Sequence, residues 1–203
     1  MKTRKTLYFA LILALLIVAG LISCTQGTRK KETLANLSDN MHSSYAAEIS
    51  YNLSSGDFIL SGDAIITKNK ANTTLKLLTP EQYSGLTIDY DVTGAPQSVA
   101  VHFSGIDTTL PNLALSRINT IAQLFSEDFV QVLTMQGTDK ISEVENVNTG
   151  ETEYFTQVSF ANSLVGVRLS AQEEKPLYFE FTSDELSGNI TFESFEIAYE
   201  NNK

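Results

Sequence analysis

The sequence predicts a mainly β fold with helices (α+β): a single, strongly curved antiparallel sheet, or half-barrel, with an N-terminal helix and a central helical insert on its concave face. Two observations predict it. About ten segments place apolar residues at every second position and are separated by turn-forming residues, as in an antiparallel meander. One stretch with helical spacing precedes these segments, and a second stretch separates the first five of them from the rest. Because so many strands in one sheet must curl or split, we expect a helix to cover the concave side.

The predicted domain opens with a helix and continues with five strands. The apolar residues of the helix recur at spacings of three and four: Leu34, Leu37, Met41 and Tyr45. From Tyr45 onward the spacing changes to two, which indicates a strand. The five predicted strands cover residues 45–54, 58–66, 73–78, 86–92 and 99–103. Gly62 interrupts the second strand, where we expect a bulge or bend.

A second helical pattern covers residues 112–135. Its apolar positions are Leu115, Ile118, Ile121, Ala122, Phe125, Phe129 and Leu133. Pro111 is well placed as an early helical residue, and Ser126 is suited to cap the second of two shorter helices. Such an amphipathic segment either fills the core of the curved sheet or forms a movable lid over an apolar groove, and the pattern fits both.

Strands resume after this insert. The predicted segments cover residues 143–147, 154–160, 164–171, 177–181 and 189–199. In the last of them the apolar phase slips between Phe192 and Phe195, which predicts a bulge. Residues 32–203 together are long enough to form one domain with a sizeable core.

The N-terminus has the features of an export signal. Lys2, Arg4 and Lys5 precede residues 7–22, which are uncharged and fewer than the about 20 apolar residues that a spanning helix needs. Cys24 follows small and aliphatic residues, and this arrangement resembles the bacterial lipoprotein signal, or lipobox. The resemblance implies that the chain is cleaved before the cysteine, which then carries a diacylglyceryl group with fatty-acyl chains such as palmitate.

Three sections of the chain follow from this interpretation. Residues 1–23 are the lipoprotein signal peptide, residues 24–31 are a polar lipid-anchored tether, and residues 32–203 are the half-barrel domain. Two or more acyl chains hold a protein firmly at a membrane, whereas one binds only marginally. We therefore expect a protein anchored through Cys24 at the extracytoplasmic face of a bacterial cell membrane.

Composition limits the partners. The chain has 14 Lys and Arg against 24 Asp and Glu, and removal of residues 1–23 leaves 11 against 24, a formal charge of −13. Such a surface is repelled by nucleic acid and by anionic headgroups, so we expect no nucleic-acid partner. Cys24 is the sole cysteine, which excludes an intramolecular disulfide and a thiolate metal cluster.

The sequence has no recognisable catalytic signature. His42 and His102 lie on different predicted elements, and two histidines without a nearby cysteine do not make a common zinc site. Asp89 and Asp91 project from one strand face, which suits an exposed surface better than glycoside chemistry. Asp107 is assigned to a loop. We therefore expect no enzymatic activity, no metal ion and no cofactor.

The order of the elements resembles a known family. A lipobox, a short helix, a run of hairpins, a helical insert and a second run of hairpins are similar to the LolA-type half-barrel. Lipoprotein carriers, mycobacterial glycolipid-binding lipoproteins and clostridial germination lipoproteins of the GerS type share that fold. The most similar local segment is a proline-containing corner between two strands, Leu77-Leu78-Thr79-Pro80-Glu81-Gln82-Tyr83-Ser84-Gly85-Leu86-Thr87-Ile88-Asp89-Tyr90-Asp91. The resemblance implies a hydrophobic concavity that takes acyl chains in the carriers, and partner binding without lipid transport in the GerS type.

Two binding functions are open on this basis. Because a protein anchored at Cys24 cannot diffuse between membranes, we favour a non-catalytic module that binds an exported protein partner. The alternative is an acyl-chain-binding or lipoprotein-carrier role that uses an apolar groove in the half-barrel. Inward-facing aromatic and aliphatic residues either line such a cavity or fill an ordinary core. The candidate lining residues are Tyr51, Ile66, Ile88, Tyr90, Phe103, Ile121, Phe125, Phe179 and Phe181.

Overall fold

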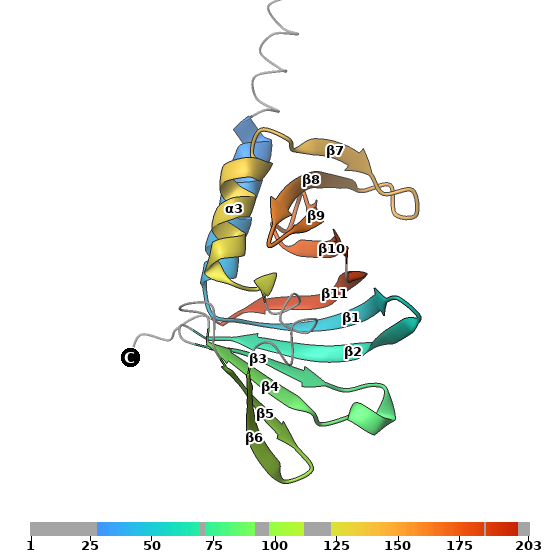
Figure 1. Ribbon diagram of the computed structural model, residues 1–203. Helices are drawn as coiled ribbons and strands as arrows, with labels where there is room; N and C mark the ends of the chain where they lie inside the picture. The colour runs from blue at the N-terminus through green and yellow to red at the C-terminus, as the bar shows by residue number, and fades with distance from the viewer. Residues whose placement is uncertain (1–27, 70–71, 92–97, 112–122, 185, 199–203) are drawn as a thin grey trace, which may run out of the picture.

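A computed structural model describes residues 28–69, 72–91, 98–111, 123–184 and 186–198 (Figure 1). The described chain forms an open sheet of eleven strands and two helices. The strands are β1 (Tyr45–Ser55), β2 (Phe58–Lys68), β3 (Asn72–Leu77), β4 (Thr87–Asp91), β5 (Ser98–Phe103), β6 (Ile106–Pro111), β7 (Ser142–Glu145), β8 (Thr152–Phe160), β9 (Ser163–Ser170), β10 (Pro176–Thr182) and β11 (Ser187–Ile197). A 3₁₀ turn, η1 (Glu81–Tyr83), lies between β3 and β4.

All neighbouring strands are antiparallel, in the order β6-β5-β4-β3-β2-β1-β11-β10-β9-β8-β7. The first and last strands of the domain therefore meet in the middle of the sheet, and each half is a meander. The sheet is strongly curved, and β6 and β7 form its two edges (Figure 1). The predicted single, curved antiparallel sheet is confirmed.

Two irregularities in the strands were expected, and one is found. The register between β1 and β11 shifts where Glu48 pairs with Ser194 and Ile49 pairs with Phe192, so the predicted bulge in the last strand is confirmed. The prediction of a bulge at Gly62 is wrong, because β1 and β2 pair without a break through this residue. The glycine has another role, which is described with the site below.

Strand β6 was not predicted. Ile106 is 67% exposed, and the strand carries threonines and an aspartate in place of alternating apolar residues. An edge strand of this kind lacks the period-two apolar signal, because it buries little of its surface. Asp107 therefore belongs to a strand and not to a loop. Pro111 ends this strand, so its predicted place at the start of a helix is wrong.

The N-terminal helix covers residues 28–42. It begins earlier than the domain boundary drawn from the sequence, because residues 28–31 are helical and were assigned to the tether. It also ends earlier than its apolar spacing suggests, since Tyr45 already belongs to β1. Its buried residues are Thr33, Leu34, Leu37, Ser38 and Met41.

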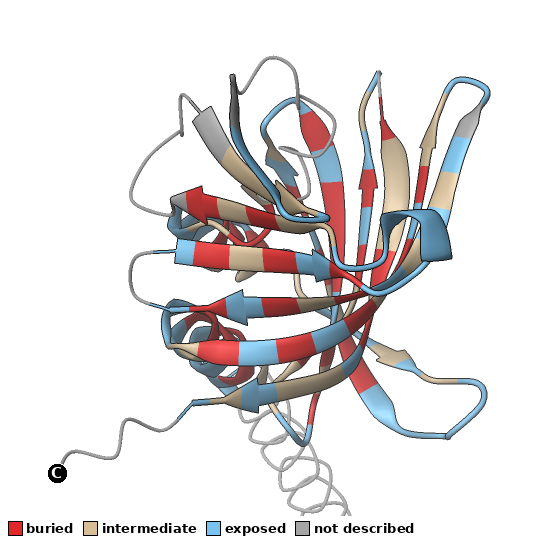
Figure 2. Ribbon diagram, turned by 90° about the horizontal axis from the view of Figure 1, so that it is seen from below, coloured by how far each residue is buried: buried red, intermediate tan, exposed pale blue. Residues whose placement is uncertain are grey.

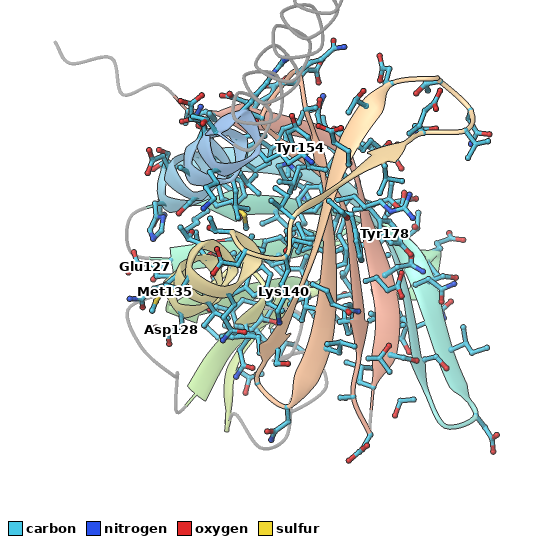
Figure 3. All side chains as sticks on the ribbon, turned by 90° about the horizontal axis from the view of Figure 1, so that it is seen from above. Glu127, Asp128, Met135, Lys140, Tyr154 and Tyr178 are labelled. Atoms are coloured by element: carbon cyan, nitrogen blue, oxygen red, sulfur yellow. The ribbon has the colours of Figure 1, made fainter. Side chains whose placement is uncertain are left out.

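The central insert contains helix α3 (Glu127–Gly137). Ser126 caps it as predicted, because the backbone amide of Phe129 donates to the Ser126 hydroxyl at 3.2 Å. Residues 112–122 of the predicted helical segment lie outside the described residues. Figure 3 shows Asp128 and Met135 on the side of α3 that faces solvent, and Met135 is 71% exposed.

Candidate functional site

One half of the concave face, formed by β8 to β11, is covered by the two helices (Figure 1). The Phe129 ring of α3 packs against Phe160 at 5.3 Å and against Phe179 at 5.7 Å between centroids. The Thr156 hydroxyl of β8 donates to the Gly137 carbonyl at 2.9 Å, which fixes the end of the helix on the sheet. We call this region the helix-covered half. It is a packed core.

The other half of the same face, formed by β1 to β4, contains an apolar hollow. Counted with the open solvent at its mouth, the space measures about 370 Å³, and the part that the centre of a water molecule can occupy is about 30 Å³. Figure 2 shows how buried and exposed residues alternate along these strands, so that one side chain in two faces inward. We call this region the hollow half. The lining residues are Ile49, Tyr51, Leu53, Leu60, Leu75, Leu77 and Ile88.

Beside the hollow, the middle of β2 has small residues at its inward-facing positions. Gly62 pairs with Tyr51, and Ala64 pairs with both Ile49 and Leu77, so the strand contributes almost no side-chain volume there. A Cβ atom on Gly62 would lie 2.2 Å from the Thr79 carbonyl oxygen. The glycine thus lets the corner after β3 descend onto the sheet.

Hydrogen bonds hold this corner in place at the Gly62 end of the hollow. The Tyr51 hydroxyl donates to the Thr79 carbonyl at 2.9 Å, and the backbone amide of Asp63 donates to the Thr79 hydroxyl at 2.7 Å. Burial and the neighbouring Asp63 carboxylate raise the pKa of Tyr51, so this phenol remains a hydrogen-bond donor at neutral pH. The corner contains Pro80 and the turn η1.

The next inward-facing row beyond Leu75 and Ile88 is polar, although the lining of the hollow itself is apolar. Lys68 of β2 pairs with Thr73 of β3, and Thr73 pairs with Tyr90 of β4, so the three residues lie side by side on neighbouring strands. Each is at most 4% exposed. We call these three residues the polar row. Tyr45, which pairs with Lys68 across β1 and β2, continues the row toward β11.

Lys68 is the charged member of the polar row. Its ammonium group donates to the Met41 carbonyl at 2.7 Å, at the end of helix 28–42, where a cation interacts favourably with the helix dipole. Burial lowers the pKa of this ammonium group, and the negative charge of Glu127 opposes that effect. Burial also raises the pKa of the Tyr90 hydroxyl, so the phenol stays neutral.

The candidate lining residues divide between the two halves. Tyr51 and Ile88 line the hollow, while Ile66 and Tyr90 are buried on the same inward faces beside it. Phe103 is half-buried on β5. Phe125 and Phe179 pack together in the helix-covered half at 6.2 Å between ring centroids, and Phe181 is fully buried on β10. Ile121 and Cys24 lie outside the described residues.

The sequence did not identify Lys68 or Thr73 as site residues. Lys68 ends a strand beside a turn, which is where an exposed lysine is usual. A signal was nevertheless present, because Lys68 and Thr73 follow the inward parity of Ile66 and Leu75.

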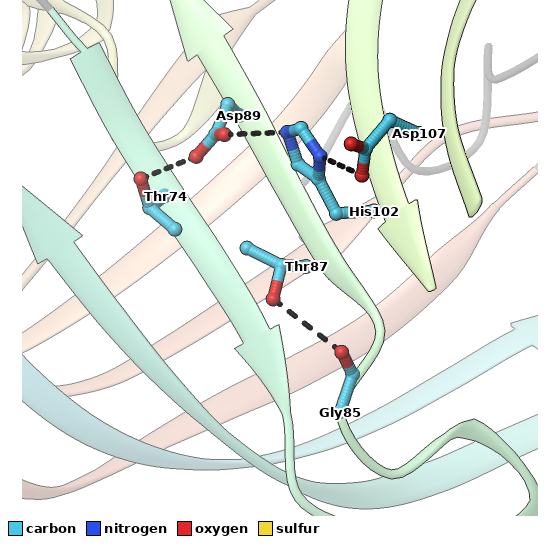
Figure 4. A network of polar contacts seen from close by, with 6 residues as sticks. All are labelled: Thr74, Gly85, Thr87, Asp89, His102 and Asp107. Carbon is cyan, nitrogen blue, oxygen red and sulfur yellow. Dashed lines mark hydrogen bonds and ion pairs between the residues drawn. The ribbon is translucent and has the colours of Figure 1, made fainter. Parts of the chain in front are cut away.

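The convex side of the hollow half carries a polar network around His102 (Figure 4). One imidazole nitrogen, Nδ1, lies 2.8 Å from Asp107, and the other, Nε2, lies 3.2 Å from Asp89, which also accepts a hydrogen bond from Thr74. The hydrogen bond with Asp107 and the charges of both carboxylates raise the pKa of His102. His42 lies on helix 28–42 and is not part of this network. No group of metal-ligating side chains with suitable geometry occurs in the described parts of the chain.

Known proteins were compared with the chain by sequence and by structure. No family model and no curated protein matches the sequence. An uncharacterized conserved protein from Thermus thermophilus is similar in structure, with 11% identity, a TM-score of 0.50, and coverage of 82% of this chain and 86% of that chain. The structural neighbours of the chain also include LolA superfamily proteins.

Two further structural neighbours are named proteins. A LolA superfamily protein from Nitrosomonas europaea has 9% identity and a TM-score of 0.43, and the match covers 82% of this chain and 92% of that chain. LprF from Mycobacterium bovis has 10% identity and a TM-score of 0.46, with the same coverage. Identities this low concern the fold alone. Within the described residues, no helix is long and apolar enough to cross a membrane.

Proposed function

We propose that the protein is a membrane-anchored, extracytoplasmic binding protein that holds an acyl chain in the hollow and has no catalytic turnover. The observation that carries this proposal is the contrast within one concave face: among the described residues, helices fill one half, while the other half keeps an apolar hollow that opens to solvent. Each buried methylene group contributes about 0.8 kcal/mol, so an acyl chain gains substantial binding energy from such walls.

The lipid anchor at Cys24 is part of the proposal. The export signal, the lipobox and the polar residues after the cysteine support it. Mass spectrometry of the mature protein should find an N-terminal diacylated Cys24, and Cys24→Ala should leave an uncleaved or released protein. A mature N-terminus elsewhere, or an unmodified Cys24, would contradict the anchor without affecting the hollow.

Binding of an exported protein partner, as in the GerS-type germination lipoproteins, is the second candidate function. A specific observation favours it: the edge strands β6 and β7 have no neighbour on their outer side among the described residues. Ile106 begins β6 with 67% exposure, and Val147, which follows β7, is 98% exposed. Unpaired edges and exposed apolar residues are suited to β-strand addition by another chain.

A fluorescent fatty-acyl probe, titrated into the folded, delipidated protein, tests the acyl-chain function. We expect saturable binding that natural lipids displace. Ile88→Phe narrows the hollow from β4 and should abolish binding. The matched control is Leu164→Phe, which adds the same ring to a residue of β9 that is 46% exposed, and it should bind like the wild type.

The two candidate functions predict opposite results in this experiment. No saturable binding by the folded wild type would contradict the acyl-chain proposal. A stable complex with one defined exported protein, lost when β6 or β7 receives a proline, would then support the partner function, since proline cannot complete a strand pair.

A further inference from the structure

The polar row is the inward-facing row next to the apolar hollow. Tyr90 and Thr73 are 4% and 2% exposed, and their hydroxyl groups have no hydrogen-bond partner. A buried polar group without a partner destabilises a fold by about 1–3 kcal/mol. The two hydroxyls lie at paired positions of neighbouring strands, beside a buried lysine. They are therefore available to donate hydrogen bonds to a ligand.

Lys68 also has donors to spare. An ammonium group offers three N–H donors, and the structure assigns one of them to the Met41 carbonyl. The only carboxylate that acts on its charge among the described residues is Glu127, which is exposed on α3 and forms no ion pair with it. Within the described parts of the chain, the buried positive charge thus has no ion-pair partner, which is costly unless an anion binds.

The polar row and the hollow are continuous along the strands. Leu75 follows Thr73 by two residues on β3, and Ile88 precedes Tyr90 by two on β4. Two residues of a strand span about 6.6–6.8 Å, and alternate residues share a face. On an inward-curving sheet, side chains of the concave face converge. The hollow therefore has apolar walls and, one side-chain row beyond them, a group of donors.

We propose that the polar row binds the carboxylate head of a long-chain amphiphile, a free fatty acid or another long-chain carboxylate, whose chain lies in the hollow. This proposal rests on the proposed acyl-chain function. The Lys68 ammonium and the Thr73 and Tyr90 hydroxyls supply one charge and several donors to the two oxygens of one carboxylate. Hydrogen bonds to an ionised acceptor are about twice as strong as neutral ones, so the row selects an anion over a neutral head.

The chemistry of the row excludes other head groups. A cationic head would meet the Lys68 charge, and an uncharged ester would leave that charge without a partner. The mature chain has a formal charge of −13, so attraction of the carboxylate to the whole protein does not explain binding. The selectivity must come from the polar row itself, which makes it sensitive to single substitutions.

The test compares a long-chain fatty acid with its methyl ester, both displacing the acyl probe from the folded, delipidated protein. We expect the acid to bind at least about tenfold more tightly than the ester, in keeping with a charge-assisted contact. Lys68→Met keeps the length of the side chain and should remove this preference. Tyr90→Phe and Thr73→Val should each reduce it severalfold, while affinity for the ester stays unchanged.

Unfolding of the ligand-free variants provides an independent readout. Because the hydroxyls have no partner, Tyr90→Phe and Thr73→Val should leave the denaturation midpoint unchanged or raise it. A lower midpoint in both variants would show that the hydroxyls serve the fold, for example through buried water, and would overturn the proposal. Equal affinity of the wild type for acid and ester would overturn it as well, while leaving the acyl-chain function intact. Failure of both ligands to bind would contradict the acyl-chain function itself.

Discussion

The helix-covered half and the hollow half belong to one sheet, yet their concave faces differ in what fills them. In the helix-covered half, aromatic rings from the central insert and from β10 and β11 meet at 4.9–6.3 Å between centroids. In the hollow half, Gly62 and Ala64 occupy the inward positions of the central strand. The concave face of so curved a sheet must be covered to bury its apolar side chains. Among the described residues, helices cover one half of it. The difference places the packed core in one half and the open apolar space in the other.

The largest expected effect is the loss of a ring from the helix-covered half. Phe129→Ala should destabilise the protein by about 3–5 kcal/mol, because it removes a fully buried ring that contacts Phe160 and Phe179. Leu75→Ala in the hollow half should cost less, since part of its surroundings is already empty. Urea denaturation measures both. Equal losses would contradict the division into two regions.

The next effect is a difference in the free energy of unfolding between the same change, isoleucine to phenylalanine, made in each half. Ile190→Phe adds a ring to a fully buried position beside Phe179 and should cost about 1–3 kcal/mol through overpacking. Ile88→Phe directs the same ring into the hollow and should change the free energy of unfolding by under about 1 kcal/mol. A cost at Ile88 that equals the cost at Ile190 would show that the hollow is not available space.

A destabilisation of similar size is expected at the corner that bounds the hollow. Gly62→Ala places a methyl group where the Thr79 carbonyl lies and should destabilise the protein by about 1–3 kcal/mol while weakening acyl binding. Gly56→Ala is the control: nothing lies near its Cβ, although its φ of +61° makes alanine strained by about 1 kcal/mol. The control should leave binding unchanged. Binding that is equally sensitive to both substitutions would argue against a role for the corner.

The smallest effect concerns pH and the outer face of the hollow half. The pKa of His102 is raised by its hydrogen bond with Asp107 and by both carboxylates, so its folded-state value lies above its value in the unfolded chain. The resulting stabilisation is full below the unfolded pKa of about 6.5 and disappears as pH rises through the folded pKa. NMR titration should show the raised pKa, and His102→Gln should flatten this pH dependence. A pKa at or below the ordinary value would contradict the network in Figure 4.

The sequence revealed the fold better than the site. Alternation along the strands predicted the single curved sheet, and the phase slip before Phe195 predicted the bulge in β11. Both signals come from the chain's own periodicity. Strand β6 was missed because an exposed edge strand has no need of alternating apolar residues.

The site depends on contacts between strands, which periodicity does not report. The role of Gly62 rests on the approach of Thr79 from the corner after β3, and the polar row requires the register of β2, β3 and β4. The sequence also could not show which inward-facing aromatic residues belong to the packed core and which to the hollow. Phe179 belongs to the packed core and Tyr51 to the hollow because, in the described part of the chain, the helices cover β8 to β11.

The most direct test of the division between the two halves is a methyl NMR titration of the folded, delipidated protein with a long-chain fatty acid. The reporters in the hollow half are Ile88, Leu75 and Leu77, and those in the helix-covered half are Val167 and Leu133. We predict saturable shifts of the first group at one stoichiometric equivalent, with the second group unmoved. Shifts confined to Val167 and Leu133, or spread evenly over both groups, would contradict the division.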